Sequence, residues 1–135
     1  MKYGRVLLAD SHLNMLGSVH GLLDPLFESV LMVADEPSLV DAVATFQPDL
    51  VVVDLSLPSD GEANIARRLL ERCPKLRLIV LSVHDEPSVA AQVCQAGATG
   101  FVLKRSAATE LVPAMHEVLG GGVYMSAALR EVVPQ

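Results

Sequence analysis

Short apolar runs alternate with longer amphipathic segments along the chain. The run at residues 50–53 is the clearest, because four consecutive apolar residues end abruptly in Asp54. A strand without polar alternation is expected to be buried on both faces, as in a parallel sheet. Similar runs predict five strands in all, at residues 5–10, 29–34, 50–54, 76–81 and 100–104.

Between these runs, apolar residues recur with helical spacing. They predict five helices, at residues 13–23, 38–46, 62–72 and 87–96, and from Ser106 or Thr109 to residue 119. Ser38 is the expected N-cap of the second helix, and Gly97 the expected left-handed residue after the fourth. A proline inside a helix removes a backbone hydrogen bond, so Pro113 predicts a late start or a bend in the last helix.

Five strands that alternate with five helices predict an α/β fold with a doubly wound, five-stranded parallel sheet in three layers. This pattern ends at residue 119. Three glycines then predict a flexible junction, which is followed by a short extended segment at residues 123–125 and by a helical stub to residue 133, capped by Ser126.

Composition narrows the class of protein. The chain has 135 residues, enough for one domain with its own core, and no apolar run is long enough to cross a bilayer. No signal peptide precedes the first strand, so we expect a soluble cytoplasmic protein without a membrane partner. The net charge of −6 argues against direct nucleic-acid binding by this chain, and its two cysteines form no zinc or redox motif.

Polar side chains stand at the ends of four predicted strands: Asp10, Asp54, Ser82 and Lys104. Each alone has an ordinary explanation, and a single strand-end Asp54 would most often be a turn residue. Together they predict a site, because the carboxyl ends of parallel strands share the edge where ligands bind. Two carboxylates suit a hard cation such as Mg²⁺, and a carboxylate can attack phosphorus to form an aspartyl-phosphate. The lysine and the hydroxyl would then balance the charge on the phosphoryl oxygens.

Four segments together resemble the receiver domain of two-component response regulators. They are Val6-Leu7-Leu8-Ala9-Asp10, Val53-Asp54-Leu55-Ser56-Leu57-Pro58, Ile79-Val80-Leu81-Ser82 and Gly97-Ala98-Thr99-Gly100-Phe101-Val102-Leu103-Lys104. The chain is most similar to the branch with a C-terminal LuxR-type helix-turn-helix output domain, for which Ala9-Asp10-x-His12 and the closing Gly-Gly-Val-Tyr-Met-Ser are typical. The resemblance implies a flavodoxin-like (βα)5 fold with strand order 2-1-3-4-5. It also implies a receiver domain at residues 1–119, with residues 120–135 leading to an output domain.

The same resemblance implies roles for the strand-end residues. Asp54 would accept a phosphoryl group from a histidine of a sensor kinase, and Lys104 would pair with the phosphoryl oxygens. Mg²⁺ would be held by Asp10, by Asp54 and by the backbone carbonyl of Ser56. A protein of this kind catalyses only its own phosphorylation and dephosphorylation, and is otherwise not an enzyme.

Four further roles follow from the resemblance. Ser82 and Phe101 would form the switch, the hydroxyl swinging in to hydrogen-bond the phosphoryl group while the ring repacks inward. Ser56 and His84 stand where the family tunes the lifetime of the aspartyl-phosphate. A solvated loop residue is an equally good interpretation of His84.

The chain departs from the family pattern in three places. Ser11 stands where a second metal-binding acid is expected, so Mg²⁺ binding should be weaker. The loop at residues 58–61 is one residue shorter than usual, and Arg105 replaces the proline that follows the lysine in many receivers.

The expected partners are a sensor histidine kinase, the chain's own C-terminal DNA-binding domain and a second copy in a homodimer. The glycine-rich junction favours an output domain that is missing from this chain. A stand-alone receiver is the alternative. A pseudo-receiver that signals through phosphorylation-independent protein contacts is the alternative function, and Ser11 is its main support. Two other classes of protein fit poorly. A phosphatase with an aspartate nucleophile requires a second acid at the position of Ser56, and a dinucleotide-binding domain requires a glycine-rich turn after the first strand, which this chain lacks.

Overall fold

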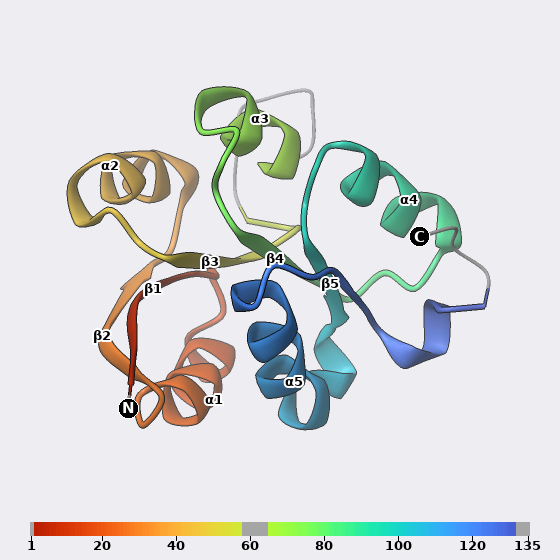
Figure 1. The fold of residues 1–135 in the computed structure, drawn as a ribbon, viewed down its shortest axis with the longest axis horizontal. Helices are drawn as coiled ribbons and strands as arrows, with labels where there is room; N and C mark the ends of the chain where they lie inside the picture. Colours follow the sequence, from red (N-terminus) through yellow and green to blue (C-terminus); the bar gives the residue numbers. More distant parts are fainter. Residues whose placement is uncertain (1, 58–64, 132–135) are drawn as a thin grey trace.

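The computed structural model describes residues 2–57 and 65–131, with the side chains of residues 13–16 excepted. Its centre is a parallel sheet with the strand order β2-β1-β3-β4-β5-β6 (Figure 1). The strands are β1 (Tyr3–Ala9), β2 (Phe27–Val33), β3 (Leu50–Asp54), β4 (Leu78–Ser82), β5 (Gly100–Leu103) and β6 (Tyr124–Met125). The order 2-1-3-4-5 is therefore as the resemblance implied.

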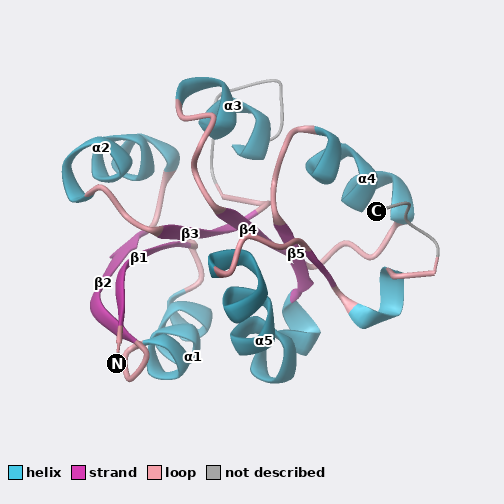
Figure 2. Cartoon of the chain, viewed as in Figure 1, coloured by secondary structure: helices cyan, strands magenta, loops and turns pink. Residues whose placement is uncertain are grey.

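Helices cover both faces of the sheet, as predicted for three layers (Figure 2). On one face lie α2 (Glu36–Phe46), α3 (Ile65–Arg72) and α4 (Pro87–Gln95); on the other lie α1 (Leu13–Leu23) and α5 (Ala107–Leu119). Two short 3₁₀ helices, η1 (Lys104–Ser106) and η2 (Ala127–Leu129), follow β5 and β6. No helix of the described residues is both long and apolar enough to cross a membrane.

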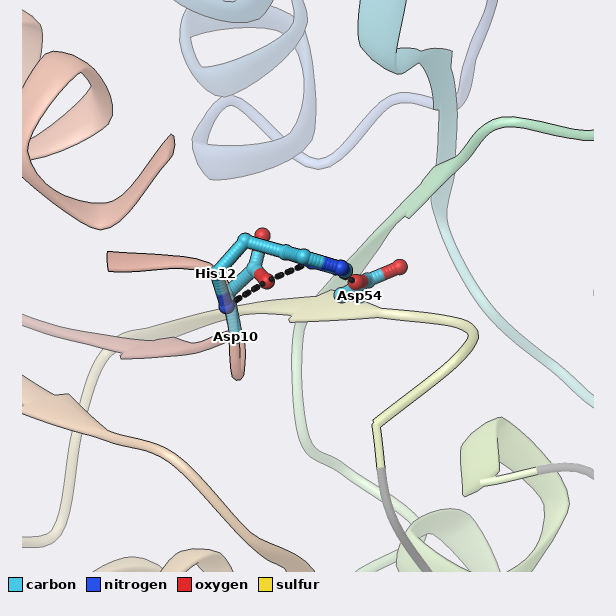
Figure 3. Close-up of side chains that lie close together, drawn as sticks. All are labelled: Asp10, His12 and Asp54. Atoms are coloured by element: carbon cyan, nitrogen blue, oxygen red, sulfur yellow. Dashed lines mark hydrogen bonds and ion pairs between the residues drawn. The ribbon is translucent and has the colours of Figure 1, made fainter. Parts of the chain in front are cut away.

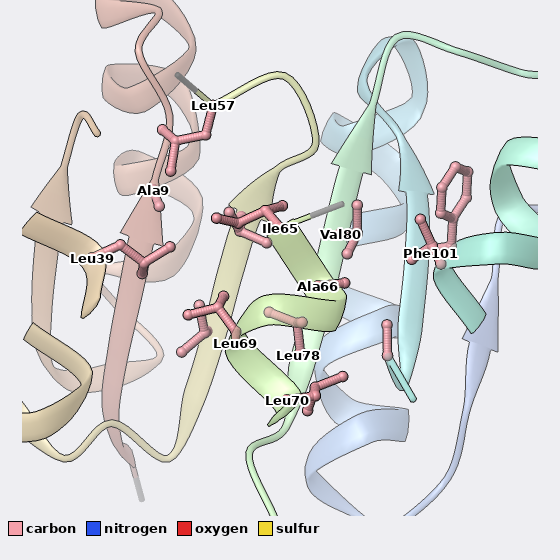
Figure 4. Close-up of a cluster of buried hydrophobic side chains, with 14 of the residues drawn as sticks. Ala9, Leu39, Leu57, Ile65, Ala66, Leu69, Leu70, Leu78, Val80 and Phe101 are labelled. Atoms are coloured by element: carbon pink, nitrogen blue, oxygen red, sulfur yellow. The ribbon is translucent and has the colours of Figure 1, made fainter. Parts of the chain in front are cut away.

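Each face of the sheet has its own hydrophobic core, because side chains alternate along a strand. In β3, Val51 and Val53 face the core under α2, α3 and α4, whereas Leu50 and Val52 face the core over α1 and α5. Figure 4 shows the first of these cores, where side chains of α2 and α3 meet those of the strands. β3 and β4 are buried along their whole length, which explains their continuous apolar sequence.

The prediction of five strands is wrong, because a sixth, β6, pairs in parallel with β5. Its two residues lie within the extended segment predicted at residues 123–125. The Tyr124 N–H donates to the Thr99 carbonyl, and the Ser126 N–H donates to the Phe101 carbonyl, both at 2.9 Å. These bonds satisfy backbone groups that would otherwise lie unpaired along β5.

One cap prediction is wrong, and another is right in position only. The N-cap of α2 is Asp35, not Ser38: the Asp35 carboxylate accepts the Ser38 N–H at 2.8 Å, and Pro37 lies in the first turn, where a proline is tolerated. Ser126 precedes η2, but its hydroxyl makes no cap hydrogen bond there and instead accepts the Leu103 N–H of β5. The predicted stub is also too long, because η2 ends at Leu129 and residues 130–131 form a turn; residues 132–133 lie outside the described residues.

The other helix ends agree more closely with the sequence. Gly97 has a φ of +106° directly after α4, as predicted for a left-handed residue. Of the two predicted starts for α5, Ser106 is the N-cap, so the late start at Thr109 is wrong and Pro113 lies inside the helix, on its exposed side. The predicted start of α3 and the shortened loop lie outside the described residues.

Candidate functional site

Two buried carboxylates lie side by side at the carboxyl edge of the sheet. Asp10 directly follows β1, and Asp54 is the last residue of β3; Ala9 and Val53 are paired neighbours across these two strands. The two aspartates are 3% and 1% exposed. Burying two anions together is costly unless a positive charge accompanies them.

Lys104 supplies that positive charge from the end of β5. Its Nζ lies 2.7 Å from Asp54 Oδ2 and 3.0 Å from Asp10 Oδ2. The first contact is a hydrogen bond, whereas Asp10 Oδ2 is buried and accepts no aligned hydrogen bond. The structure thus brings together three of the four strand-end residues singled out in the sequence.

Asp54 also accepts two hydrogen bonds from Ser56, one from the backbone N–H to Oδ1 at 3.1 Å and one from the hydroxyl to Oδ2 at 3.0 Å. Burial raises the pKa of Asp54, but the hydrogen bonds from Lys104 and Ser56 outweigh it, so the pKa lies below its usual value. Burial lowers the pKa of Lys104, yet its contacts with Asp54 and Asp10 outweigh that effect and raise the pKa. Both groups are therefore charged at neutral pH.

His12 is the site residue that sequence reasoning did not single out. Its backbone N–H donates to Asp10 Oδ1 at 2.8 Å, and its Nδ1 lies 2.9 Å from the same oxygen and 3.4 Å from Asp54 Oδ2. Figure 3 shows the imidazole reaching from the loop after β1 across to Asp54. Asp10, His12 and Asp54 form the one group of three metal-binding side chains among the described residues, with their ligand atoms within 4.8 Å of one another.

The two proposed switch residues, Ser82 and Phe101, are both buried, and neither contacts the carboxylates of the site through a described hydrogen bond. Ser82 ends β4 and is 1% exposed, but its hydroxyl bonds locally, accepting the His84 N–H at 2.9 Å and donating to the His84 carbonyl at 3.2 Å. Among the described residues it has no hydrogen bond to Asp54 or Lys104. The ring of Phe101 is fully buried in the core under α3 and α4 (Figure 4).

The remaining predicted residues lie on the solvent side of the site. Ser11 is exposed, and in the described part of the chain its hydroxyl makes no hydrogen bond. The His84 imidazole is exposed and lies 3.6 Å from the Glu86 carboxylate, a geometry that fits both interpretations of this residue.

The donors fit a divalent cation. Asp10 and Asp54 contribute carboxylate oxygens, the ligands that Mg²⁺ prefers, and one oxygen of Asp10 is buried without a hydrogen-bond donor. Ser11 places a hydroxyl, not a third carboxylate, next to them.

Comparison with known proteins gives the same family as the sequence resemblance, over most of the chain. Residues 6–116 match the family model described as the response regulator receiver domain. The chain is 31% identical over 123 residues to the transcriptional regulatory protein DegU of Brevibacillus brevis, and 35% identical over 125 residues to the transcriptional regulatory protein UhpA of Salmonella typhimurium. It covers 52% and 61% of these two relatives, so it spans little more than half of their length.

Solved structures agree. A two-component response regulator of the LuxR family from Aurantimonas sp. has a TM-score of 0.86 and 29% sequence identity, with 94% of this chain and 92% of that chain covered. The RcsB response regulator of Salmonella typhimurium has a TM-score of 0.89 over 98% of this chain and 68% of that chain; at 22% identity it supports the fold alone. With its fold, its acidic pocket and the family match in agreement, this chain belongs to the response regulator receiver domains of two-component systems.

Proposed function

We propose that the chain is a phosphorylatable receiver in which Asp54 accepts a phosphoryl group from a sensor histidine kinase. The observation that carries the proposal is the buried arrangement of Asp54, Asp10 and Lys104, with one ammonium within 3.0 Å of both carboxylates. A positive charge fixed beside the carboxylate that would react is placed to stabilise the negative charge of a transferred phosphoryl group.

The side chains present fit the chemistry of this transfer. An oxygen of Asp54 forms a bond to phosphorus while the bond between phosphorus and the kinase imidazole breaks, and the imidazole nitrogen keeps the electron pair of that bond. Asp54 must be ionised to attack, and the lowered pKa keeps it so at neutral pH. Lys104 then pairs with the oxygens of the transferred group, because these oxygens carry negative charge, whereas the carboxylate loses its own when it bonds to phosphorus.

The metal in this proposal is Mg²⁺, held by Asp10, Asp54 and the backbone carbonyl of Ser56. When bound it would neutralise charge on the phosphoryl oxygens and orient them. The hydroxyl of Ser56 already contacts Asp54 at 3.0 Å, which suits its proposed part in tuning the lifetime of the aspartyl-phosphate, together with His84.

Phosphorylation would act on the output by population shift. Ser82 would exchange its local bonds with His84 for one to the phosphoryl group, and Phe101 would lock inward beside it. The proposed output is a C-terminal DNA-binding domain that controls transcription in the full-length protein, as the names of the DegU and UhpA relatives suggest. A homodimer of receivers and a cytoplasmic location belong to the same proposal.

The test is phosphate transfer from a small phosphodonor, read by intact mass. We expect wild type to gain one phosphoryl group when Mg²⁺ is present, and Asp54→Asn to gain none. Asp41→Asn is the matched control, because Asp41 is an exposed acid on α2, and it should label like wild type. Equal labelling of Asp54→Asn would refute the assignment.

A pseudo-receiver remains the second candidate, and the exposed hydroxyl at Ser11 is the observation that favours it. It would use the same fold to bind a partner without phosphorylation. A Mg²⁺ titration followed by NMR separates the two, since only the phosphorylatable receiver shifts the signals of Asp10 and Asp54 in a saturable way.

A further inference from the structure

His12 adds a nitrogen donor to the two carboxylates of the site. Its Nδ1 is 2.9 Å from Asp10 Oδ1 and 3.4 Å from Asp54 Oδ2. Two ligands of one octahedral ion, each about 2.1 Å from it and at right angles, lie about 3 Å apart. His12 Nδ1 therefore lies at about the spacing of a neighbouring ligand from each of these two carboxylate oxygens, and the ligand atoms of the three side chains all lie within 4.8 Å of one another.

A second observation also points to a cation here. Asp10 is 3% exposed, yet its Oδ2 accepts no hydrogen bond and faces only the Lys104 ammonium, at 3.0 Å. The same ammonium lies 3.2 Å from His12 Nδ1. Lys104 is thus the positive charge on which all three donors converge, and a cation bound by them would take over its contact with Asp10.

The chemistry of the donors decides which cation suits them. Mg²⁺ takes oxygen ligands, whereas an imidazole nitrogen suits first-row transition metals such as Fe²⁺, Ni²⁺, Cu²⁺ and Zn²⁺; Mn²⁺ prefers oxygen ligands but also accepts an imidazole. With a hydroxyl at Ser11, His12 is the third metal-binding side chain that converges with Asp10 and Asp54 among the described residues. The donor set is therefore two oxygens and one nitrogen.

We propose that His12 is a metal ligand of this receiver and makes the site select a first-row transition metal over Mg²⁺. The inference rests on the proposed phosphoacceptor function for its purpose, but metal binding itself does not require phosphorylation. On metal binding, Nδ1 would ligate the ion through its lone pair, with the ring proton on Nε2.

The probe is Mn²⁺, added to the whole chain without a phosphodonor. Pulsed electron paramagnetic resonance detects a nitrogen bound directly to Mn²⁺, and competition gives the ratio of Mn²⁺ to Mg²⁺ affinity. His12→Ala should keep the fold, because the imidazole is 60% exposed and makes no cap bond to α1. His12→Gln is a second variant that keeps the size of the side chain, and His20→Ala is the control, a histidine on α1 outside the site.

Wild type and His20→Ala should show the nitrogen coupling, and both His12 variants should lose it. We also expect Mn²⁺ affinity to fall about tenfold in the His12 variants, with Mg²⁺ affinity changed less than about twofold. Bound Mn²⁺ without nitrogen coupling in wild type, or an unchanged affinity ratio in His12→Ala, would overturn the proposal. The proposed function fails separately, through absence of phosphoryl labelling on Asp54 with either metal.

Discussion

Lys104 holds two acids in a space that water hardly reaches. Its side chain is 10% exposed, against 1% for Asp54 and 5% for Asp10. Burial raises the pKa of Asp54, and the hydrogen bonds from Lys104 and Ser56 outweigh that effect, so Asp54 stays ionised there. One ammonium for two carboxylates leaves the cluster with a net negative charge, which attracts a further cation.

The first prediction concerns the pH range over which Lys104 stabilises the fold. The pKa of Asp54 is lowered from 3.8, so its contribution is present above pH 3.8 and is lost as pH falls through the folded pKa. The pKa of Lys104 is raised from 10.5, so its contribution is present below pH 10.5 and is lost as pH rises through the folded pKa. Between these limits Lys104→Met should lower the free energy of unfolding by about 1–2 kcal/mol, after allowance for solvent screening.

Urea unfolding across this pH range checks it, with the exposed Lys75→Met as control. The gap between wild type and Lys104→Met should narrow below pH 3.8, where Asp54 takes up its proton. A gap that stays constant on further acidification would show that the stabilisation does not come from this ion pair.

Some residues of the site could be predicted from the sequence, and others could not. Asp10, Asp54 and Lys104 could be found because each ends a strand, and parallel strand ends converge. His12 could not, because it lies in a loop and its contacts depend on the turn that folds it back onto Asp10. The signal was present in part: His12 stands two residues after a strand-end acid, where a backbone N–H regularly returns to such a carboxylate.

Whole elements were easier to predict than their ends. The strands follow from unbroken apolar runs, and, except for the final helical stub, the described ends of strands and helices differ from the predicted ones by at most two residues. The extended conformation at residues 123–125 was predicted, but the pairing of β6 with β5 was not, because two residues carry no periodic pattern. The predicted start of α2 is wrong because Asp35 and Ser38 are both good capping residues; Pro37 between them, which is tolerated in the first turn of a helix, favours Asp35.

Two glycines give an element-scale prediction with opposite signs. An added Cβ at Gly100 in β5 would lie 2.8 Å from Ile79 Cγ1 and 3.4 Å from Val118 Cγ2, so Gly100→Ala should destabilise the protein by about 1–3 kcal/mol. At Gly17 in α1 nothing lies within 4 Å, so Gly17→Ala should stabilise it by about 0.5–1 kcal/mol.

Thermal and urea unfolding of both variants measure this contrast. Since the substitution is the same, the difference reports only on its surroundings. A stable Gly100→Ala would mean that α5 does not pack as closely on β4 and β5 as described.

At the scale of the molecule, Ser126 ties the segment after α5 to the strand that leads into the site. It is fully buried; its N–H donates to the Phe101 carbonyl and its hydroxyl accepts the Leu103 N–H, both at 2.9 Å. Lys104 is the next residue along the chain. The segment after α5 is therefore hydrogen-bonded to β5 at Phe101 and at Leu103, directly before Lys104 of the site.

We expect Ser126→Ala to leave the Leu103 N–H buried without an acceptor, at a cost of about 1–3 kcal/mol. Hydrogen exchange at Leu103 should become faster, as should exchange across β6. Ser88→Ala, at an exposed position of α4, is the control and should change neither rate. If Leu103 keeps its protection in Ser126→Ala, the hydrogen bond from Leu103 to the Ser126 hydroxyl is not what holds this strand.

The short strand β6 has a consequence for how the protein can assemble. Growth of a continuous intermolecular sheet needs two long open edges, one on each side of every copy. β2 offers such an edge with seven residues, and Leu31 and Met32 on it are 37% and 44% exposed. On the opposite side β6 covers β5 and presents only two residues before the chain turns into η2. Edge-to-edge growth therefore stops at a pair of molecules joined through β2, and loss of residues 124–129 would open the route to polymers.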